Sequence, residues 1–308
     1  MTHDKYMIAV WGAPGGGKTT LAVNMATVLA DSGYMTCLVS GTDHGELQAF
    51  FGTSIPKGKG LYAAISNGRN VRESLTQARP NLCILELDTG GDSFDIASIT
   101  PDQVQHMLSD LRDQFSYVVV DCTSHKESTF TGVGLAESDK VIVAIPHRVS
   151  AATWHIANTQ MLEAVAGKTI YVDVNTREGG CDMDQLLSSM GLPDCDFKLN
   201  CVDAAYLCEN TGRPIVTTSG RAEKKYRAAV LNLVKFILKK EKDERGKKNQ
   251  DDDEPKEKRG FFGFGKPKKR ESDGVKQEKK MSKRQMQKAE DEAMRRAMNG
   301  DYGDDENN

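Results

Sequence analysis

The sequence predicts an α/β fold with a doubly wound, mainly parallel sheet and helices on both faces. Short apolar runs alternate with helix-like stretches from Met7 onward, the first of these stretches being Thr19–Ser32. The runs are rich in β-branched residues and lack polar alternation, which is typical of parallel strands covered on both sides. Strands that alternate with helices in this way build crossover units and hence a doubly wound sheet. We expect strands at MIAVW, TCLVS, NLCILEL, YVVVD, KVIVAIP and TIYVDVN.

The composition indicates one folded domain, residues 1–240, followed by a charged tail, residues 241–308. The 308 residues are 38% hydrophobic and 28% charged, which allows one substantial core but not a wholly globular chain. A helix is predicted at Arg221–Lys239, because apolar residues recur there near helical spacing: Val230, Leu231, Val234, Ile237 and Leu238. We expect this helix to dock on the core; the alternative is a helix on a membrane surface.

The tail is dominated by lysine, arginine, aspartate and glutamate. It cannot bury enough apolar surface to offset chain entropy, so we expect it to be largely disordered, with a short charged helix at 276–298. The run KEKRGFFGFGKPKKR places three aromatic residues among cations: Phe261, Phe262 and Phe264. A solvated tail, docking to a protein partner and contact with an anionic membrane surface all fit this pattern, and nucleic acid fits it least.

Charge, cysteine spacing and apolar runs limit the class of protein. The formal net charge of −3 averages over dissimilar regions and identifies no partner. The start of the chain lacks a leader pattern, and no run approaches the roughly 18 apolar residues of a spanning helix, so we expect a cytoplasmic protein. The cysteines form no CxxC pair or metal-like cluster, so we expect reduced thiols, buried or half-buried: Cys37, Cys83, Cys122, Cys181, Cys195, Cys201 and Cys208.

A phosphate-binding motif lies between the first predicted strand and the first helix. The segment GAPGGGKTT matches the spacing G-x-x-x-x-G-K-[ST], and this strand–loop–helix context is the one that the motif needs. Backbone N–H groups of the loop and of the helix N-terminus hold phosphate oxygens there. We expect Lys18 to pair with the β- and γ-phosphates and the Thr19 hydroxyl to bind Mg²⁺. The predicted ATP-binding residues of this loop are Gly12, Gly15, Gly16, Gly17, Lys18, Thr19 and Thr20.

An acidic residue follows the strand YVVVD at its carboxyl end, where ligands collect in such sheets. With a phosphate loop present, Asp121 is expected to orient the water shell of the Mg²⁺. The alternative is an ordinary strand-end cap. The sequence therefore predicts a protein that binds ATP and Mg²⁺ together.

The chain resembles the ParA/MinD family of nucleotide-switched dimers over roughly Tyr6 to Leu238. The resemblance is carried by a loop that ends GKTT close to the N-terminus and by segments in the family's order: GLYAAISNGRNVRESL, DLRDQFSYVVVDC, LAESDKVIVAIP, VDVN and LCENTGRPIV. It implies a P-loop NTPase fold, nucleotide-dependent homodimers, contact of Thr20 with the α-phosphate, and reading of the adenine edge by Asn175. An ordinary strand-end turn is the alternative at Asn175.

The chain departs from the family at two charged positions. The family's loop reads G-K-G-G-x-G-K-T, and its early lysine reaches across the dimer to the partner's phosphates; this chain has Ala13, followed by Pro14. After the second strand the family has D-x-D-P-Q, whose first aspartate helps to position the attacking water. Ser40 stands at that position. The resemblance therefore implies slow hydrolysis.

Two neighbours of Ser40 are candidates to replace the missing acid. The segment TCLVSGTDHGE places Thr42 at the family's second aspartate, and Asp43 or His44 could substitute only through a local shift. The run after Asp121, CTSHKEST, also lacks the proline-rich switch segment that is usual in the family.

These features favour an ATP-dependent factor that positions or assembles a larger machine, such as a pilus, secretion or conjugation apparatus. Branches of the family with eroded loops, including the TadZ/CpaE type, do such work, although a receiver-like domain usually precedes their P-loop and none is expected here. A ParA-type partitioning ATPase is the alternative. It would need a basic surface for DNA, whereas residues 1–238 hold 20 lysines and arginines against 26 aspartates and glutamates. A bacterial tyrosine kinase would need a C-terminal tyrosine cluster, and the tail offers only Tyr302.

Overall fold

A computed structural model describes residues 5–42, 44–66, 70–91, 98–174, 180–200, 202 and 205–251, with side chains as far as Leu238 except that of Tyr206. The chain divides into two compact units between Ile237 and Leu238. Of the second unit the structure describes residues 238–251, the end of the last helix.

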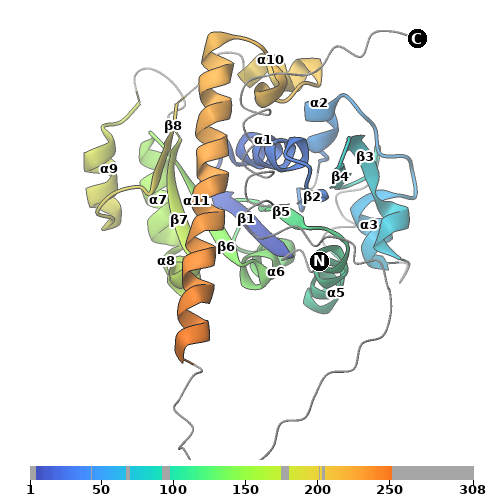
Figure 1. The fold of residues 1–308 in the computed structure, drawn as a ribbon, viewed down its shortest axis with the longest axis horizontal. Helices are drawn as coiled ribbons and strands as arrows, with labels where there is room; N and C mark the ends of the chain where they lie inside the picture. The colour runs from blue at the N-terminus through green and yellow to red at the C-terminus, as the bar shows by residue number, and fades with distance from the viewer. Residues whose placement is uncertain are drawn as a thin grey trace, which may run out of the picture. The chain divides into compact units, whose positions relative to one another are not determined.

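The first unit is built on an eight-stranded sheet in the order β3-β4-β2-β5-β1-β6-β7-β8 (Figure 1). Every neighbouring pair is parallel except the antiparallel edge pair β3–β4. The fold class predicted from the sequence is therefore confirmed. The strands are β1 (Tyr6–Gly12), β2 (Thr36–Ser40), β3 (Thr76–Arg79), β4 (Leu82–Leu85), β5 (Tyr117–Asp121), β6 (Lys140–Pro146), β7 (Thr169–Val174) and β8 (Phe197–Leu199).

Helices cover the sheet on both sides, with α1 on one side and α5 and α6 on the other (Figure 1). The α-helices are α1 (Lys18–Asp31), α2 (Leu47–Phe51), α3 (Gly60–Ser66), α5 (Pro101–Gln114), α6 (Thr129–Glu137), α7 (Val149–Ala157), α8 (Thr159–Val165), α9 (Met183–Met190), α10 (Ala205–Thr211) and α11 (Arg221–Asp251). Three short 3₁₀ helices are also present, η1 (Val71–Ser74), η2 (Ala166–Lys168) and η3 (Ile215–Thr217).

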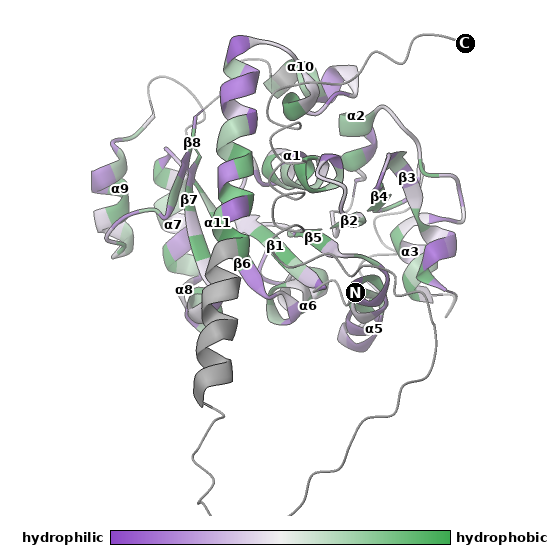
Figure 2. Cartoon of the chain, viewed as in Figure 1, coloured by the Kyte–Doolittle hydropathy of each residue, from purple (hydrophilic) through white to green (hydrophobic). Residues whose placement is uncertain are grey.

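Strand β1 shows why the central runs are apolar throughout. Met7, Ala9 and Trp11 join a core cluster with residues of α5, α6, α7 and α9, whereas the alternate residues Ile8 and Val10 are equally buried outside that cluster. Successive side chains of a strand point to opposite faces, so both faces of β1 are covered. The hydropathy colouring follows the same pattern, with the central strands largely hydrophobic (Figure 2).

The sequence analysis missed two edge strands. Strand β3 reads TQAR and pairs only with β4, with Asn81 in the left-handed region (φ 59°) in the turn between them. Strand β8, FKL, has three residues and pairs with β7. Edge strands lack the buried apolar run on which the prediction relied.

The last helix docks on the core, as predicted. Val230, Leu231 and Val234 are all buried, and the Phe236 ring lies 5.3 Å from that of Phe197. Helix α11 runs to Asp251, past the domain boundary predicted at residue 240, whereas the compact unit ends at Ile237. The predicted helix at 276–298 and Phe261, Phe262 and Phe264 lie outside the described residues.

The described cysteines are free thiols. Cys37, Cys122 and Cys208 are buried, and the others are half-buried: Cys83, Cys181 and Cys195. Burial raises the pKa of Cys37, so this thiol stays protonated at neutral pH. No helix in the described part of the chain is long and apolar enough to cross a membrane.

Candidate functional site

The loop between β1 and α1 has the backbone of a phosphate cradle. Its glycines take positive φ values, 149° at Gly12, 65° at Gly15 and 74° at Gly17, which other residues adopt only under strain. Gly17 forms the N-cap of α1, and Lys18 is the first residue of that helix. A helix of 14 residues therefore points the free N–H groups of its first turn at the loop, as phosphate binding requires.

The end of β6 closes the outside of this loop. Gly12 stands opposite Ala144 in the sheet register, and a Cβ on Gly12 would come within 2.5 Å of the Ala144 carbonyl oxygen. A Cβ on Gly16 would lie 3.3 Å from Cδ of Pro146. The glycines are therefore needed both for backbone conformation and for close packing against β6.

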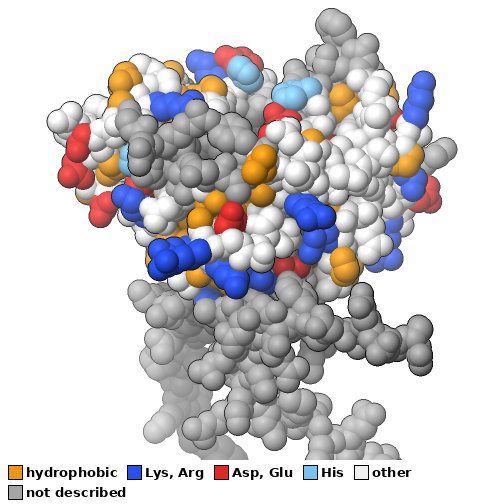
Figure 3. All heavy atoms as spheres, turned by 90° about the horizontal axis from the view of Figure 1, so that it is seen from above, with side chains coloured by type: hydrophobic (Ala, Val, Ile, Leu, Met, Phe, Trp, Pro, Cys, Tyr) orange, Lys and Arg blue, Asp and Glu red, His pale blue; other side chains and the backbone are white. Residues whose placement is uncertain are grey.

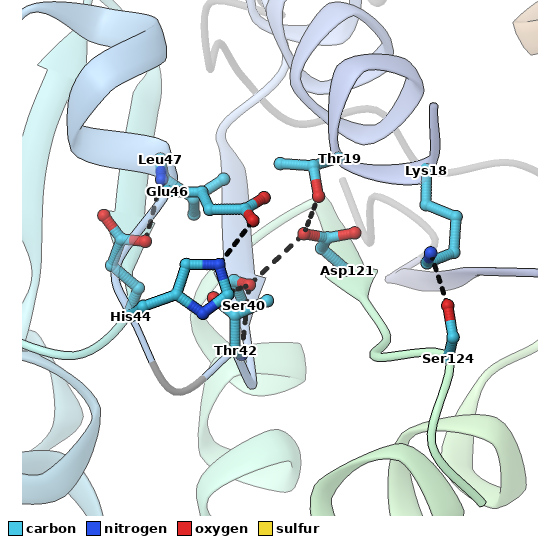
Figure 4. Close-up of polar contacts among 10 residues, drawn as sticks. Lys18, Thr19, Ser40, Thr42, His44, Glu46, Leu47, Asp121 and Ser124 are labelled. Atoms are coloured by element: carbon cyan, nitrogen blue, oxygen red, sulfur yellow. Dashed lines mark hydrogen bonds and ion pairs between the residues drawn. The ribbon is translucent and has the colours of Figure 1, made fainter. Parts of the chain in front are cut away.

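Lys18 lies in the loop with two oxygen partners from its own chain. Its ammonium group donates to the Ala13 carbonyl at 3.1 Å. It also donates to the Ser124 hydroxyl at 2.7 Å (Figure 4). Burial lowers the pKa of Lys18, and the charges of Asp121 and Glu46 oppose that shift. A partly desolvated cation held by two neutral oxygens is a strong site for phosphate, because an anion supplies the charge that the present partners lack.

Asp121 ends β5 directly beside β2 and α1. It is 1% exposed, and its Oδ2 accepts hydrogen bonds from the hydroxyls of Thr19 at 2.9 Å and Ser40 at 3.2 Å (Figure 4). The sheet register pairs Ser40 with Asp121, which explains why residues 81 positions apart meet. Burial raises the pKa of Asp121 to about 7, against the hydrogen bond from Thr19 and the charge of Lys18.

The arrangement of Thr19 and Asp121 fits a magnesium ion. Within the part of the chain that the structure describes, Oδ1 of Asp121 is buried and accepts no hydrogen bond. A hydroxyl and a carboxylate are hard oxygen ligands of the kind that Mg²⁺ prefers when it also keeps waters and phosphates. Thr19 would bind the ion and Asp121 would hold its water shell; the ion would neutralise phosphate charge.

The two family positions that lack charge are both buried and neutral. Ala13 carries no charge and is 1% exposed, so the loop offers no cation at that position. At the second position the Ser40 hydroxyl also lies 3.1 Å from that of Thr42, which builds a neutral network where the family has carboxylates. Asp43, one candidate for the missing acid, lies outside the described residues.

His44, the other candidate, pairs with a carboxylate that the sequence analysis did not consider. Its Nε2 lies 2.6 Å from Oε1 of Glu46, whose side chain is 33% exposed. Glu46 and Thr19 line the same cavity, and the charge of Glu46 acts to raise the pKa values of both Lys18 and Asp121. Glu46 is therefore an acidic side chain of the same cavity as Lys18 and Thr19.

A second missed carboxylate, Glu86, is fully buried after β4. It accepts hydrogen bonds from the backbone N–H groups of Leu47 at 2.8 Å and Gln48 at 2.7 Å, and so holds the start of α2. Burial raises the pKa of Glu86 to about 7. Because both backbone N–H groups need an acceptor, the role of Glu86 is to position the loop that carries His44 and Glu46.

A cavity of about 960 Å³ opens over the loop. Lys18, Thr19 and Thr20 line it, and the cavity continues past apolar residues of β7, β8, η3 and α11, which suit a flat base: Val174, Leu199, Ile215 and Tyr226. Asn175, expected to read the adenine edge, follows Val174 but lies outside the described residues. Its role stays a prediction.

Comparison with known proteins identifies the family of the chain. The model of the AAA domain family AAA_31 matches residues 5–165, and the chain belongs to that family and thereby to the P-loop ATPases of the ParA/MinD type. The septum site-determining protein MinD of Bacillus subtilis is 28% identical over 142 residues, 46% of this chain and 52% of MinD. The tyrosine-protein kinase CpsD of Streptococcus pneumoniae is 30% identical over 109 residues, 35% of this chain and 48% of the kinase. The chain thus spans about half the length of these curated relatives.

Solved structures share the fold over more of the chain. MinD of Pyrococcus horikoshii, complexed with Mg-ADP, superposes with a TM-score of 0.61 at 14% identity, over 74% of this chain and 95% of that one. A plasmid partition protein of Borrelia burgdorferi bound to AMPPNP gives a TM-score of 0.61 at 15% identity, over 77% and 100%. At these identities the likeness concerns the fold alone.

Proposed function

We propose that this protein is an ATP-binding switch with slow intrinsic hydrolysis, which positions or helps to assemble a larger cellular machine. The observation that supports the proposal is that the expected phosphate and magnesium residues lie at one loop, while a serine stands at the place of the family's catalytic acid. Lys18 contacts Ser124, Thr19 contacts Asp121, and the Ser40 hydroxyl donates to Asp121. A hydroxyl held in that way does not accept a proton from water at neutral pH, so the first carboxylate of the family's mechanism is missing.

Slow turnover gives ATP the role of a structural ligand. Positioned acid–base groups contribute about 10²–10⁴-fold to a rate, so their loss leaves a long-lived bound state. Binding then favours one conformation by mass action. A long-lived ATP-bound state suits a protein that marks the site of assembly of a larger machine. Examples are a pilus, secretion or conjugation apparatus of the kind served by TadZ/CpaE-like proteins. The nucleotide-bound form would act as a homodimer, and the tail around Phe261, Phe262 and Phe264 would recruit a protein partner or touch the inner face of the membrane.

The second candidate is a ParA-type partitioning ATPase that binds DNA non-specifically. The Borrelia partition protein shares this fold, so the fold is compatible with that function. Its requirement for a basic surface argues against it: on the face shown in Figure 3, lysine and arginine side chains are interspersed with aspartate, glutamate and neutral surface.

The test combines binding, turnover and DNA affinity on the full chain. Calorimetric titration of wild type and Lys18→Ala should show MgATP binding only in the wild type, because the substitution removes the main phosphate cation but no core side chain. Lys126→Ala, an exposed cation outside the cavity, is the control. Turnover of several ATP per second without a partner would refute the slow switch. Salt-sensitive DNA binding that requires ATP would favour the partitioning function instead.

A further inference from the structure

Arg148 brings a second cation to the phosphate loop, in addition to Lys18. It lies two residues after the end of β6, the strand that pairs with β1, and directly before α7. Its backbone N–H donates to the Pro146 carbonyl at 2.7 Å, which turns the chain back over the end of the strand. Since Pro146 also packs against Gly16, the segment is fixed on the loop at one point and Arg148 extends from it.

The guanidinium group lies over the tip of the loop. Nη1 of Arg148 is 3.1 Å from the position that a Cβ on Gly15 would take, so the absence of a side chain at Gly15 makes room for this contact. Arg148 also lines the cavity that holds Lys18 and Thr19. One nucleotide in that cavity would therefore meet both cations.

The charge of Arg148 has no acidic partner in the described part of the chain: none of the ion pairs or side-chain hydrogen bonds there involves its guanidinium. Arg148 is exposed, and its guanidinium lies beside Gly15, which carries no charge. A planar guanidinium with unused donors is well suited to phosphate, because it matches two oxygens at once.

We propose that Arg148 binds the terminal phosphates of ATP from within the same chain and takes the place of the cation that Ala13 does not supply. The inference rests on the proposed ATP-binding function and deepens it. In the resemblance described above, the early lysine acts on the partner's nucleotide, so recognition of the third phosphate depends on a dimer. Arg148, which follows β6 in the same chain, removes that dependence on a dimer. A single copy of this protein therefore distinguishes ATP from ADP.

The experiment measures the affinities of a non-hydrolysable ATP analogue and of ADP, with Mg²⁺, for the full chain by calorimetry. The variants are Arg148→Gln, which removes the charge, and Arg148→Lys, which keeps it without the planar fork. Lys126→Gln is the matched control, because Lys126 is an exposed cation in the loop after β5 that does not line the cavity. Each titration is repeated at protein concentrations about tenfold apart. Thermal melting confirms that each variant is folded.

Arg148→Gln should weaken binding of the ATP analogue by about tenfold or more, the effect of one charge-assisted contact, and that of ADP by clearly less. Arg148→Lys should lie between Arg148→Gln and the wild type, and Lys126→Gln should match the wild type. The analogue should bind more tightly than ADP at both protein concentrations, including the lower one.

Equal losses for both nucleotides, an unchanged Arg148→Gln, or selectivity that appears only at high protein concentration would overturn the inference while leaving ATP binding intact. If the wild type binds neither nucleotide, the proposed function fails, and the inference fails with it.

Discussion

The ammonium nitrogen of Lys18 lies 2.7 Å from the hydroxyl oxygen of Ser124, although the two residues are 106 positions apart. Ser124 belongs to the loop that links β5 to α6, and its carbonyl accepts a hydrogen bond from the Trp154 indole at 3.0 Å. The cation needed for phosphate is thus engaged by the chain itself. Nucleotide must displace Ser124 or share Lys18 with it, and either change reaches α7 through Trp154.

Replacing Ser124 with alanine should therefore strengthen ATP binding several-fold. The variant removes a hydrogen bond worth about 0.5–1.5 kcal/mol that competes with phosphate for Lys18, and it leaves this half-buried cation with fewer partners without nucleotide. Calorimetric titration measures the change. Ser124→Thr keeps the hydroxyl and should behave as the wild type. A weaker affinity in Ser124→Ala would mean that this hydroxyl binds the nucleotide rather than competing with it.

The buried carboxyl of Glu86 should make stability fall as pH rises. Its pKa in the folded protein is about 7, above the ordinary value of 4.5, so the folded state holds the proton more tightly than the unfolded state. The stabilisation is complete below about pH 4.5 and is lost as pH rises through 7. Asp121, shifted in the same direction to about 7, adds to this trend.

Denaturant unfolding at intervals between pH 5 and 8 checks this expectation. Glu86→Gln should flatten the pH dependence in part, because it removes one of the two titrating groups. It should also lower stability at acid pH, since an amide cannot accept hydrogen bonds from both Leu47 and Gln48 as the carboxyl does. Glu73→Gln, at an exposed carboxylate, should leave the slope unchanged. An identical slope for Glu86→Gln and wild type would contradict the assignment.

Restoring an aspartate at position 40 should destabilise the protein unless magnesium is bound. Ser40 is fully buried, and its hydroxyl lies 3.2 Å from Asp121, so a new carboxylate would face a like charge in a dry site. The cost should reach at least about 1–3 kcal/mol without metal and should shrink with MgATP. Melting with and without MgATP measures it, with Ser40→Asn as the uncharged control. Phosphate release by Ser40→Asp should rise above that of wild type. If MgATP does not reduce the loss of melting temperature in Ser40→Asp, the result would count against a magnesium site at Asp121.

The glycine at the end of β1 should tolerate no side chain. Gly12 has φ 149°, and a Cβ there would come 2.5 Å from the Ala144 carbonyl oxygen, so Gly12→Ala should cost more than about 2 kcal/mol of stability and disturb the loop. Gly132 in α6 is the comparison, since a Cβ there meets nothing within 4 Å. Gly132→Ala should be neutral or add up to about 1 kcal/mol, as alanine favours helix. Similar melting temperatures for the two variants would refute the packing argument.

The sequence predicted the central sheet, the phosphate loop and Asp121, because each leaves a local pattern: a continuous apolar run, a glycine spacing, an acid at a strand end. It did not predict Arg148, Glu46 or Ser124 as parts of the site. These residues lie in loops. Ser124 and Arg148 reach the phosphate loop because β5 and β6 flank β1 in the sheet, and Glu46 follows β2, which flanks β5. Which strands lie side by side depends on the order of strands in the sheet, and a short segment of sequence does not reveal that order.

The T-shaped pair of Trp11 and Trp154, with ring centroids 4.6 Å apart, has a practical consequence. These are the only two tryptophans of the chain, and both adjoin the phosphate loop: Trp11 directly precedes Gly12, and Trp154 is bonded to the residue that holds Lys18. All tryptophan fluorescence of the protein therefore comes from residues that adjoin the phosphate loop or contact a residue that binds Lys18. Arrival of a nucleotide that draws Lys18 away from Ser124 would alter the surroundings of Trp154, so the chain's own ultraviolet fluorescence reports occupancy of the loop without any attached label.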